Sequence, residues 1–210
     1  AKKEKGVYLG ANAALGRRGI RMKFFPENPI LVYRPFHLNE RNYLYLADRG
    51  RIYGDVRLFD DQGTGIHFYT NREDTIADQE MTVELSRIDL KQFKKVLPYL
   101  PDVEGWLGGS LHYVDSEGQM MLSADMNLDN FVYEKSPLGN WTMSGAYLPG
   151  DNNAHHVDGF ITYNDQEIIY MNGVYQADET GQENITGELE LQHFPLRVIN
   201  PFVPEKMVAF

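Results

Sequence analysis

The sequence of 210 residues contains no cysteine. This absence excludes disulfides, zinc sites built on thiolates and cysteine nucleophiles. It leaves the compartment open, because cysteine-free chains occur in both reducing and oxidising spaces. Long apolar runs are also missing: none approaches the roughly 18 residues that a membrane-spanning helix requires. We therefore expect no membrane span within this segment.

Positive charge is scarce as well. Lys and Arg number 20 against 30 Asp and Glu, which gives a net charge of -10. Binding to a nucleic-acid backbone depends on clustered Lys and Arg that displace counterions, so we expect no nucleic-acid partner. Hydrophobic residues make up 42% of the chain, which is too apolar for intrinsic disorder.

Motifs of known catalytic and metal chemistry are absent from the sequence. The six histidines do not occur in HExxH or another metal-ligand spacing, and the chain has no GxSxG, no P-loop and no GxGxxG after a strand. His155-His156 is expected to be a surface pair, and Asp60-Asp61 and Asp151-Asn-Asn153 do not continue into a full calcium loop. The sequence predicts no enzyme, with no catalytic residue, no metal site and no cofactor.

Alternation with a period of two dominates the sequence. From Gln119 to Asp129, apolar residues at even positions alternate with mostly polar residues at odd positions. This pattern is typical of a strand with one apolar and one polar face. Similar patterns or β-rich composition predict strands at 42–46, 51–59, 64–69, 82–88, 107–114, 119–129, 141–148, 156–163, 167–175 and 185–191.

Short polar turns such as Asp48-Arg-Gly50 and Asp115-Ser-Glu-Gly118 join many of these strands. Tight links require antiparallel neighbours, because a parallel crossover needs about a dozen residues or more. One short helix is predicted at 89–97, with Asp89 as its N-cap and Pro98 after its end. The fold class is therefore all-β, rich in antiparallel pairs, with one or two short helices; a β-sandwich is the alternative.

A proline phrase occurs twice, about half the chain apart. Pro98-Tyr99-Leu100-Pro101-Asp102 precedes the glycine-rich Gly105-Trp-Leu-Gly-Gly109, and Pro201-Phe202-Val203-Pro204-Glu205 follows a second predicted strand. Proline cannot donate to a strand ladder, so the phrase marks the places where pairing stops and restarts. We expect residues 1–210 to be a single elongated unit with two imperfect repeats, at 98–109 and 201–210. We also expect it to be an excerpt of a longer protein, in which another strand begins near Met207.

These phrases resemble the C-terminal region of the TamB family, which belongs to the AsmA-like group of bacterial envelope proteins. The resemblance rests on the following stretches: Pro35-Phe-His-Leu-Asn39, 42–58, Leu97-Pro-Tyr-Leu-Pro-Asp102, Gly105-Trp-Leu-Gly-Gly109, Leu189-Glu-Leu191, Phe194-Pro-Leu196 and Asn200-Pro-Phe-Val-Pro-Glu205. It implies a long, curved sheet of β-taco type whose concave face is apolar, in a Gram-negative periplasmic protein that is anchored in the inner membrane. It also implies an outer-membrane barrel as partner, and it supplies no catalytic residues.

Two roles follow from the resemblance: transfer of lipids between membranes and assistance to outer-membrane protein assembly. The cargo would be lipid acyl chains or the β-strands of outer-membrane proteins. The alternation predicts that Met120, Leu122, Ala124, Met126 and Leu128 line an apolar groove for this cargo. An extracellular β-sandwich that binds carbohydrate through exposed aromatics is the alternative function, and a glycosidase with paired carboxylates is a third.

Overall fold

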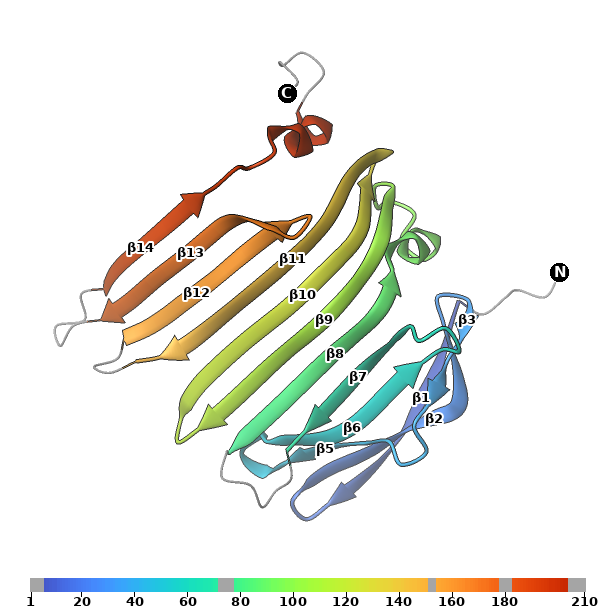
Figure 1. Cartoon of the computed structure of the whole chain (residues 1–210). Helices are drawn as coiled ribbons and strands as arrows, with labels where there is room; N and C mark the ends of the chain where they lie inside the picture. The colour runs from blue at the N-terminus through green and yellow to red at the C-terminus, as the bar shows by residue number, and fades with distance from the viewer. Residues whose placement is uncertain (1–5, 72–77, 151–153, 178–182, 204–210) are drawn as a thin grey trace. The chain divides into compact units, whose positions relative to one another are not determined.

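The computed structural model describes residues 6–71, 78–150, 154–177 and 183–203 (Figure 1). In these residues 14 strands form one sheet whose pairings are antiparallel wherever a register is defined. The strands are β1 Val7–Gly16, β2 Gly19–Leu31, β3 Arg34–Pro35, β4 His37–Leu38, β5 Tyr43–Ala47, β6 Ile52–Phe59, β7 Gly65–Thr70, β8 Gln79–Asp89, β9 Val103–Ser116, β10 Gln119–Tyr133, β11 Ser136–Pro149, β12 Ala154–Tyr163, β13 Gln166–Ala177 and β14 Glu183–Leu191.

Hydrogen-bonded neighbours follow the order of the chain. The order runs β1-β2-β5-β6-β7-β8-β9-β10-β11-β12-β13-β14, while β3 pairs with β2 and β4 pairs with β6. The all-β, antiparallel fold class is therefore confirmed. The alternative of two packed sheets does not apply, because all the described strands belong to one sheet.

Each of the ten strands predicted from the sequence is present, with ends that differ by a few residues. The strands β1 and β2 were not predicted, because their sequences lack the usual signals. Ala and Gly occupy much of β1, and Pro26 and Pro29 interrupt β2, although strands are poor in these residue types. Pairing with each other and with β5 holds these two strands in place despite their composition.

The chain divides into two compact units. The first unit comprises Ala1–Ile88 and Gly108–Leu122, and the second comprises Asp89–Leu107 and Ser123–Phe210. Small sets of buried apolar side chains form the core of each: Pro29, Phe36, Leu38 and Tyr53 in the first unit, and Leu138, Ala154, Ile168 and Val198 in the second. Ile168 is only 1% exposed and lies where the register between β12 and β13 shifts.

Buried polar side chains complete the backbone pairing of the first unit. The carboxylate of Asp60 accepts hydrogen bonds from the backbone N–H groups of Gln62 and Thr64, both at 2.9 Å, and from Arg34 Nη2 at 2.5 Å. The side-chain amide of Gln79 bonds both the N–H and the C=O of Ile52 at 2.6 Å. Such partners matter because an unpaired buried backbone group is costly.

Short 3₁₀ helices are the helical elements in the described residues: η1 Asp48–Gly50, η2 Leu90–Lys95 and η4 Leu196–Phe202. The helix predicted at 89–97 corresponds to η2, and the predicted N-cap is confirmed, since Asp89 accepts a hydrogen bond from the Lys91 backbone N–H at 3.1 Å. The helix ends at Lys95, two residues earlier than predicted, and Pro98 disfavours helical backbone at the residue before it.

Both copies of the proline phrase make the same turn. The Leu100 N–H bonds to the Leu97 carbonyl at 3.0 Å, and the Val203 N–H bonds to the Asn200 carbonyl at 3.2 Å. In each turn, proline (Pro98 or Pro201) occupies the second position, which its fixed φ favours, and an aromatic residue, Tyr99 or Phe202, occupies the third. Pro101 is half-buried, whereas Pro204 and the strand expected near Met207 lie outside the described residues.

Candidate functional site

The second unit has one apolar sheet face, which the strand registers define. Directly opposed residues of antiparallel neighbours project to the same side of a sheet. Trp141 opposes Tyr163, Met143 opposes Ile161, Ile161 opposes Ile169, and Ile169 opposes Leu191. We call the side chains on this side the apolar face: Trp141, Met143, Tyr147, Val157, Ile161, Tyr163, Ile169, Met171, Tyr175, Ile185, Leu189 and Leu191.

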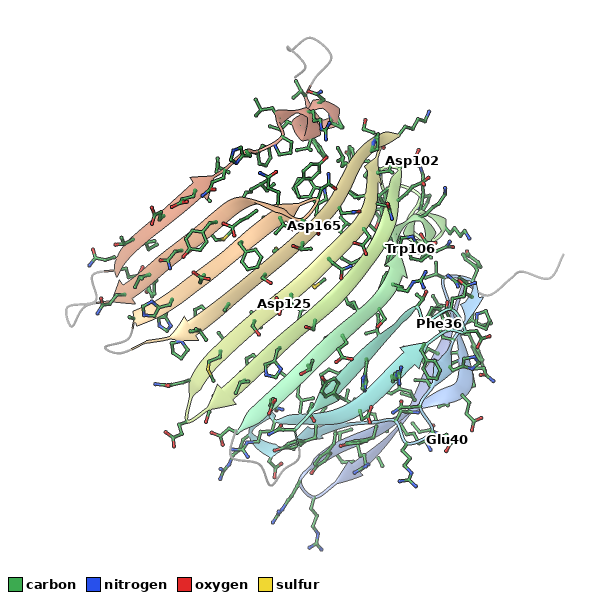
Figure 2. The ribbon with its side chains drawn as sticks, in the orientation of Figure 1. Phe36, Glu40, Asp102, Trp106, Asp125 and Asp165 are labelled. Carbon is green, nitrogen blue, oxygen red and sulfur yellow. The ribbon has the colours of Figure 1, made fainter. Side chains whose placement is uncertain are left out.

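The opposite side of the same strands is mostly polar. Thr142 opposes Thr162 there, and their hydroxyl groups share a hydrogen bond of 2.5 Å. Asp125 on β10, labelled in Figure 2, accepts a hydrogen bond from the Ser144 hydroxyl. The further members of this polar face are Asp158, Tyr170, Asn172, Thr186, Glu188 and Glu190, with Leu148, Phe160 and Val174 as large apolar exceptions.

The apolar face is open over several strands. Met143 and Val157 are 45% and 44% exposed, and three residues of β14, Ile185, Leu189 and Leu191, are 62% to 81% exposed. Soluble proteins rarely leave such contiguous apolar surface uncovered, and where they do it usually marks a binding site. The face is therefore the first candidate for function in this unit.

A groove of about 400 Å³ lies on this face. Its lining residues come from β9, β10, β11, β12 and η4: Leu107, Met126, Asn127, Leu128, Phe131, Leu138, Trp141, Thr142, Met143, Ile161, Val198 and Phe202. Val198 is buried, whereas Phe202 is more than half exposed and contacts the Tyr133 ring at 4.6 Å between centroids. The groove has a size typical of small-molecule sites, which span about 300–1,000 Å³.

Glycines continue the apolar face beyond the groove. Gly145 opposes Gly159 on β11 and β12, and Gly173 opposes Gly187 on β13 and β14. Gly145 follows Met143 on the same face, so this glycine row adjoins the groove. Glycine inside a strand often marks a place where a ligand approaches the backbone closely.

The structure brings some of the predicted groove residues together. Met126 and Leu128 line the groove, and Ala124, two residues before Met126 on β10, is half-buried. Met120 and Leu122 precede Ala124 on the same strand, belong to the first unit and are 44% and 42% exposed. The prediction missed Trp141, Ile161 and Val198, because no local pattern in the sequence links residues on separate elements.

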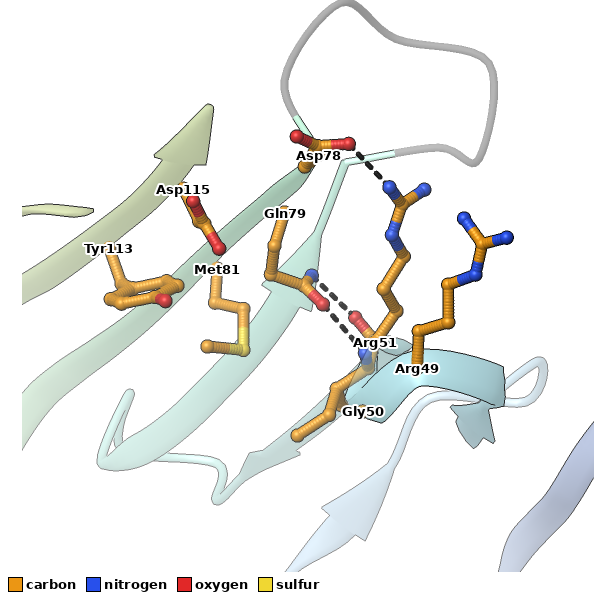
Figure 3. Close-up of a pocket in the computed structure, with 9 residues that line it drawn as sticks. Arg49, Gly50, Arg51, Asp78, Gln79, Met81, Tyr113 and Asp115 are labelled. Carbon is orange, nitrogen blue, oxygen red and sulfur yellow. Dashed lines mark hydrogen bonds and ion pairs between the residues drawn. The ribbon is translucent and has the colours of Figure 1, made fainter. Parts of the chain in front are cut away.

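The first unit holds a different kind of pocket, of about 290 Å³ (Figure 3). Arg51 pairs there with Asp78, whose second carboxylate oxygen accepts a hydrogen bond from the Glu117 N–H at 3.1 Å. A hydrogen bond with Tyr53, followed by the charge of Asp78, raises the pKa of Arg51. The charged groups thus largely satisfy one another, and the pocket lacks the continuous apolar lining of the groove.

Carboxylates surround two histidines in the first unit. His67 lies between Asp55, with Nε2 at 3.0 Å from Oδ1, and Glu84, with Nδ1 at 3.6 Å from Oε2. His112 is within hydrogen-bond distance of Thr82, at 2.9 Å, and its Nε2 lies 3.6 Å from Glu80. These are cross-strand polar pairs, which stabilise a sheet modestly.

The other sequence candidates have structural partners. Asp60 pairs with Arg34, and Asp61 Oδ1 lies 2.9 Å from His37 Nε2. His155 contacts the rings of Tyr147 and Tyr175 on the apolar face, and His156 lies on the opposite side. Asp151-Asn-Asn153 lies outside the described residues. Among the residues described, no group of three or more His, Cys, Asp or Glu side chains could hold a metal ion.

The hydrogen bond between Tyr170 and Asp158 on the polar face can be tested by titration. Its hydroxyl donates to Asp158 Oδ2 at 3.0 Å, and this hydrogen bond raises the pKa of Tyr170 above the ordinary value of 10.0. A phenol whose pKa is raised on folding stabilises the fold below its unfolded pKa, and this contribution is lost as the pH rises through the folded pKa. Asp158→Asn is expected to lower the pKa of Tyr170 and shift this loss to lower pH, which absorbance titration of the phenolate band measures. The shift should be absent in a Tyr170→Phe background; persistence there would assign it to another tyrosine.

Comparisons with family models, with curated proteins and with solved structures give no match to this chain. In the described part of the chain, no helix has the length and apolarity needed to cross a membrane. The candidate site is therefore defined by its own geometry: an open apolar face with a groove and an adjoining glycine row.

Proposed function

We propose that this chain is a non-catalytic segment that binds lipid acyl chains in the groove and on the adjoining apolar face. The observation that carries the proposal is the uncovered apolar face, whose residues on β14 are more than 60% exposed. An acyl chain is a flexible, apolar, rod-like ligand, so it matches a surface that is apolar along its length and has few polar groups to satisfy.

The energetics favour a lipid as the occupant. Exposing one CH₂ group to water costs roughly 0.8 kcal/mol, so a sixteen-carbon chain in water carries a penalty of about 13 kcal/mol. A surface that shelters part of the chain removes a corresponding part of this barrier. Met126 and Met143 in the lining suit tails of varied shape, because methionine is flexible and polarisable.

We propose that lipid binding by this chain serves the biogenesis of a bacterial envelope. The resemblance to the TamB family supports transfer of lipids between membranes, a periplasmic location and an outer-membrane barrel partner for the complete protein. Lipid binding by the groove does not depend on this setting and is testable with the chain itself.

Assistance to outer-membrane protein assembly is the second candidate. Among the described strands, β14 pairs with β13 alone, and an edge of this kind is the part of a sheet to which an extended strand adds by β-augmentation. However, β14 carries Glu183, Glu188 and Glu190, and charged residues on an edge strand are a common protection against such pairing. The apolar face therefore supports lipid more strongly than strand acceptance.

A substitution at Gly145 tests ligand binding without an expected loss of stability. A Cβ atom at this position would meet only the Asp158 carbonyl oxygen, at an ordinary 3.5 Å, so the sheet accommodates Gly145→Val. Valine favours strands over glycine, and the free energy of unfolding should stay unchanged or rise by up to about 1 kcal/mol. The added valine side chain occupies space in the glycine row beside the groove, where the acyl chain is proposed to lie. Overpacking against the acyl chain costs about 1–3 kcal/mol, which corresponds to a five- to hundredfold loss of affinity.

The measurement is displacement of the neutral fluorescent probe N-phenyl-1-naphthylamine by hexadecanol. Ala146→Val on the same strand is the matched control, because Ala146 opposes Asp158 on the polar face. We expect Gly145→Val to weaken hexadecanol binding and Ala146→Val to leave it unchanged. If the unaltered protein binds neither probe nor hexadecanol, or if the two variants lose affinity equally, the proposal is wrong.

A further inference from the structure

A basic side chain lies at the η4 end of the groove. Arg197 directly precedes Val198, which lines the groove, and its Nη2 donates a hydrogen bond to the Tyr163 hydroxyl oxygen at 3.2 Å. The Tyr163 ring in turn packs edge-on against Trp141, another lining residue, with 5.0 Å between centroids. Only the Tyr163 side chain therefore separates Arg197 from the lining residue Trp141, and the Arg197 side chain itself is exposed to solvent.

The charge of Arg197 is not neutralised in the structure. Among the described residues it makes no ion pair, in contrast to Lys91 and Lys94 of the same unit, which pair with Glu104 and Asp102. The Tyr163 oxygen accepts from Arg197, and the phenol keeps its own proton to donate. A guanidinium and a phenol O–H side by side form a donor pair that matches a carboxylate or phosphate.

Most carboxylates of β11 to β14 lie on the polar side of the sheet, and the one nearest in sequence to Tyr163 is Asp165, in the turn between β12 and β13. Asp158, Glu188 and Glu190 lie on the polar face, on the other side of the sheet. By register, the carboxylate on the apolar side of β11 to β14 is Glu183, which opposes Ala177 at the other end of the strands and bonds Tyr175. The chain is acidic overall, yet the groove ends at a positive charge.

We infer that the groove selects a single acyl chain with an anionic headgroup, and that Arg197, positioned by Tyr163, binds that headgroup while the tail lies in the groove. The inference rests on the proposed function and adds to it the class of lipid and the residue that distinguishes it. The headgroup chemistry required is a carboxylate or phosphate oxygen; a neutral alcohol gains nothing from Arg197, and a quaternary ammonium is repelled by it.

The experiment compares four sixteen-carbon ligands as competitors of N-phenyl-1-naphthylamine: hexadecanoate, hexadecyl phosphate, hexadecanol and hexadecyltrimethylammonium. The unaltered protein should bind the two anions more tightly than hexadecanol. Arg197→Gln should weaken binding of both anions about fivefold, as expected for a charge-assisted contact at a solvent-exposed position, and leave hexadecanol unchanged. A larger loss for hexadecyl phosphate than for hexadecanoate would identify phosphate as the preferred headgroup.

Lys91→Gln is the matched control for net charge, because it removes one positive charge from another 3₁₀ helix of the same unit, where Glu104 already pairs with it at 2.6 Å. Tyr163→Phe provides a second variant in case Arg197→Gln alters η4: it removes the phenol that positions Arg197 and should weaken anion binding without affecting hexadecanol. Equal affinity of the unaltered protein for anions and hexadecanol would overturn the role of Arg197 while the groove stands. Failure of all four ligands to bind would instead overturn the proposed function.

Discussion

Met143→Glu is expected to lower the affinity of the groove for hexadecanol at least about a hundredfold, because an acyl chain in the groove would strip water from the new carboxylate. Met143 lines the groove and opposes Ile161 across β11 and β12. It is 45% exposed, so in the free protein a glutamate at this position keeps its carboxylate in water and the strand pairing is retained. The change should therefore act on binding and leave the free energy of unfolding nearly unchanged.

Leu148→Glu on the same strand is the matched control. Leu148 is 46% exposed, nearly the same as Met143, but it opposes His156 on the polar face. Both variants replace a large apolar residue of β11 with the same charged one, so they share any effect on net charge and strand propensity. We expect displacement of N-phenyl-1-naphthylamine by hexadecanol to fail in Met143→Glu and to be unaffected in Leu148→Glu.

The comparison of these two variants decides which face binds. A protein in which Leu148→Glu loses as much affinity as Met143→Glu would bind hexadecanol by general hydrophobic attachment, and the groove would have no special role. Retention of full affinity in Met143→Glu would show that the ligand lies elsewhere on the chain.

Asp60→Ala is expected to reduce the free energy of unfolding by about 3 kcal/mol, since the buried carboxylate accepts hydrogen bonds from Arg34 and from two backbone N–H groups, which would lose this partner. The Asp60 side chain is only 5% exposed, and it accepts hydrogen bonds from Arg34 and from the N–H groups of Gln62 and Thr64. Its loss would leave Arg34 without this carboxylate and would unpair two backbone donors in the turn between β6 and β7.

Asp61→Ala is the control for this prediction. Asp61 is the next residue in the sequence and also has a side-chain partner, His37 Nε2 at 2.9 Å, but its side chain is 92% exposed. Exposed pairs contribute at most about 1 kcal/mol, so Asp61→Ala should change the stability little. Urea denaturation measures the free energy of unfolding of the two variants. If both variants lose the same free energy, the burial of Asp60 does not explain its contribution to stability.

The sequence predicted the local structure of this protein well. Alternation of apolar and polar residues gave ten of the strands, and the short Gly, Asn and Asp turns gave their antiparallel pairing. Both properties are local, because side chains alternate along any strand and a two- to four-residue link allows no other arrangement. The N-cap Asp89 was likewise visible, since capping involves neighbours in the chain.

The strands β1 and β2 show where local signals fail. Their alanine, glycine and proline residues argue against strands, yet pairing along nearly the whole length of β1 overrides these preferences. The groove shows the same limit at the level of the site. Met126 and Leu128 were predicted from alternation on one strand, whereas Trp141, Ile161 and Val198 come from three other elements and join them only in the folded unit.

By itself, the sequence determined that this chain is an antiparallel all-β protein whose strands have one apolar and one polar side. The tertiary structure decided which residues meet: the registers that align Gly145 with Gly159 and Met143 with Ile161, and the position of η4, which brings Val198 to the groove and Arg197 to Tyr163. The physical reason is that a shift of one residue in register would move every side chain of a strand to the other face. Register and helix docking are set by contacts between distant segments, which no local pattern in the sequence specifies.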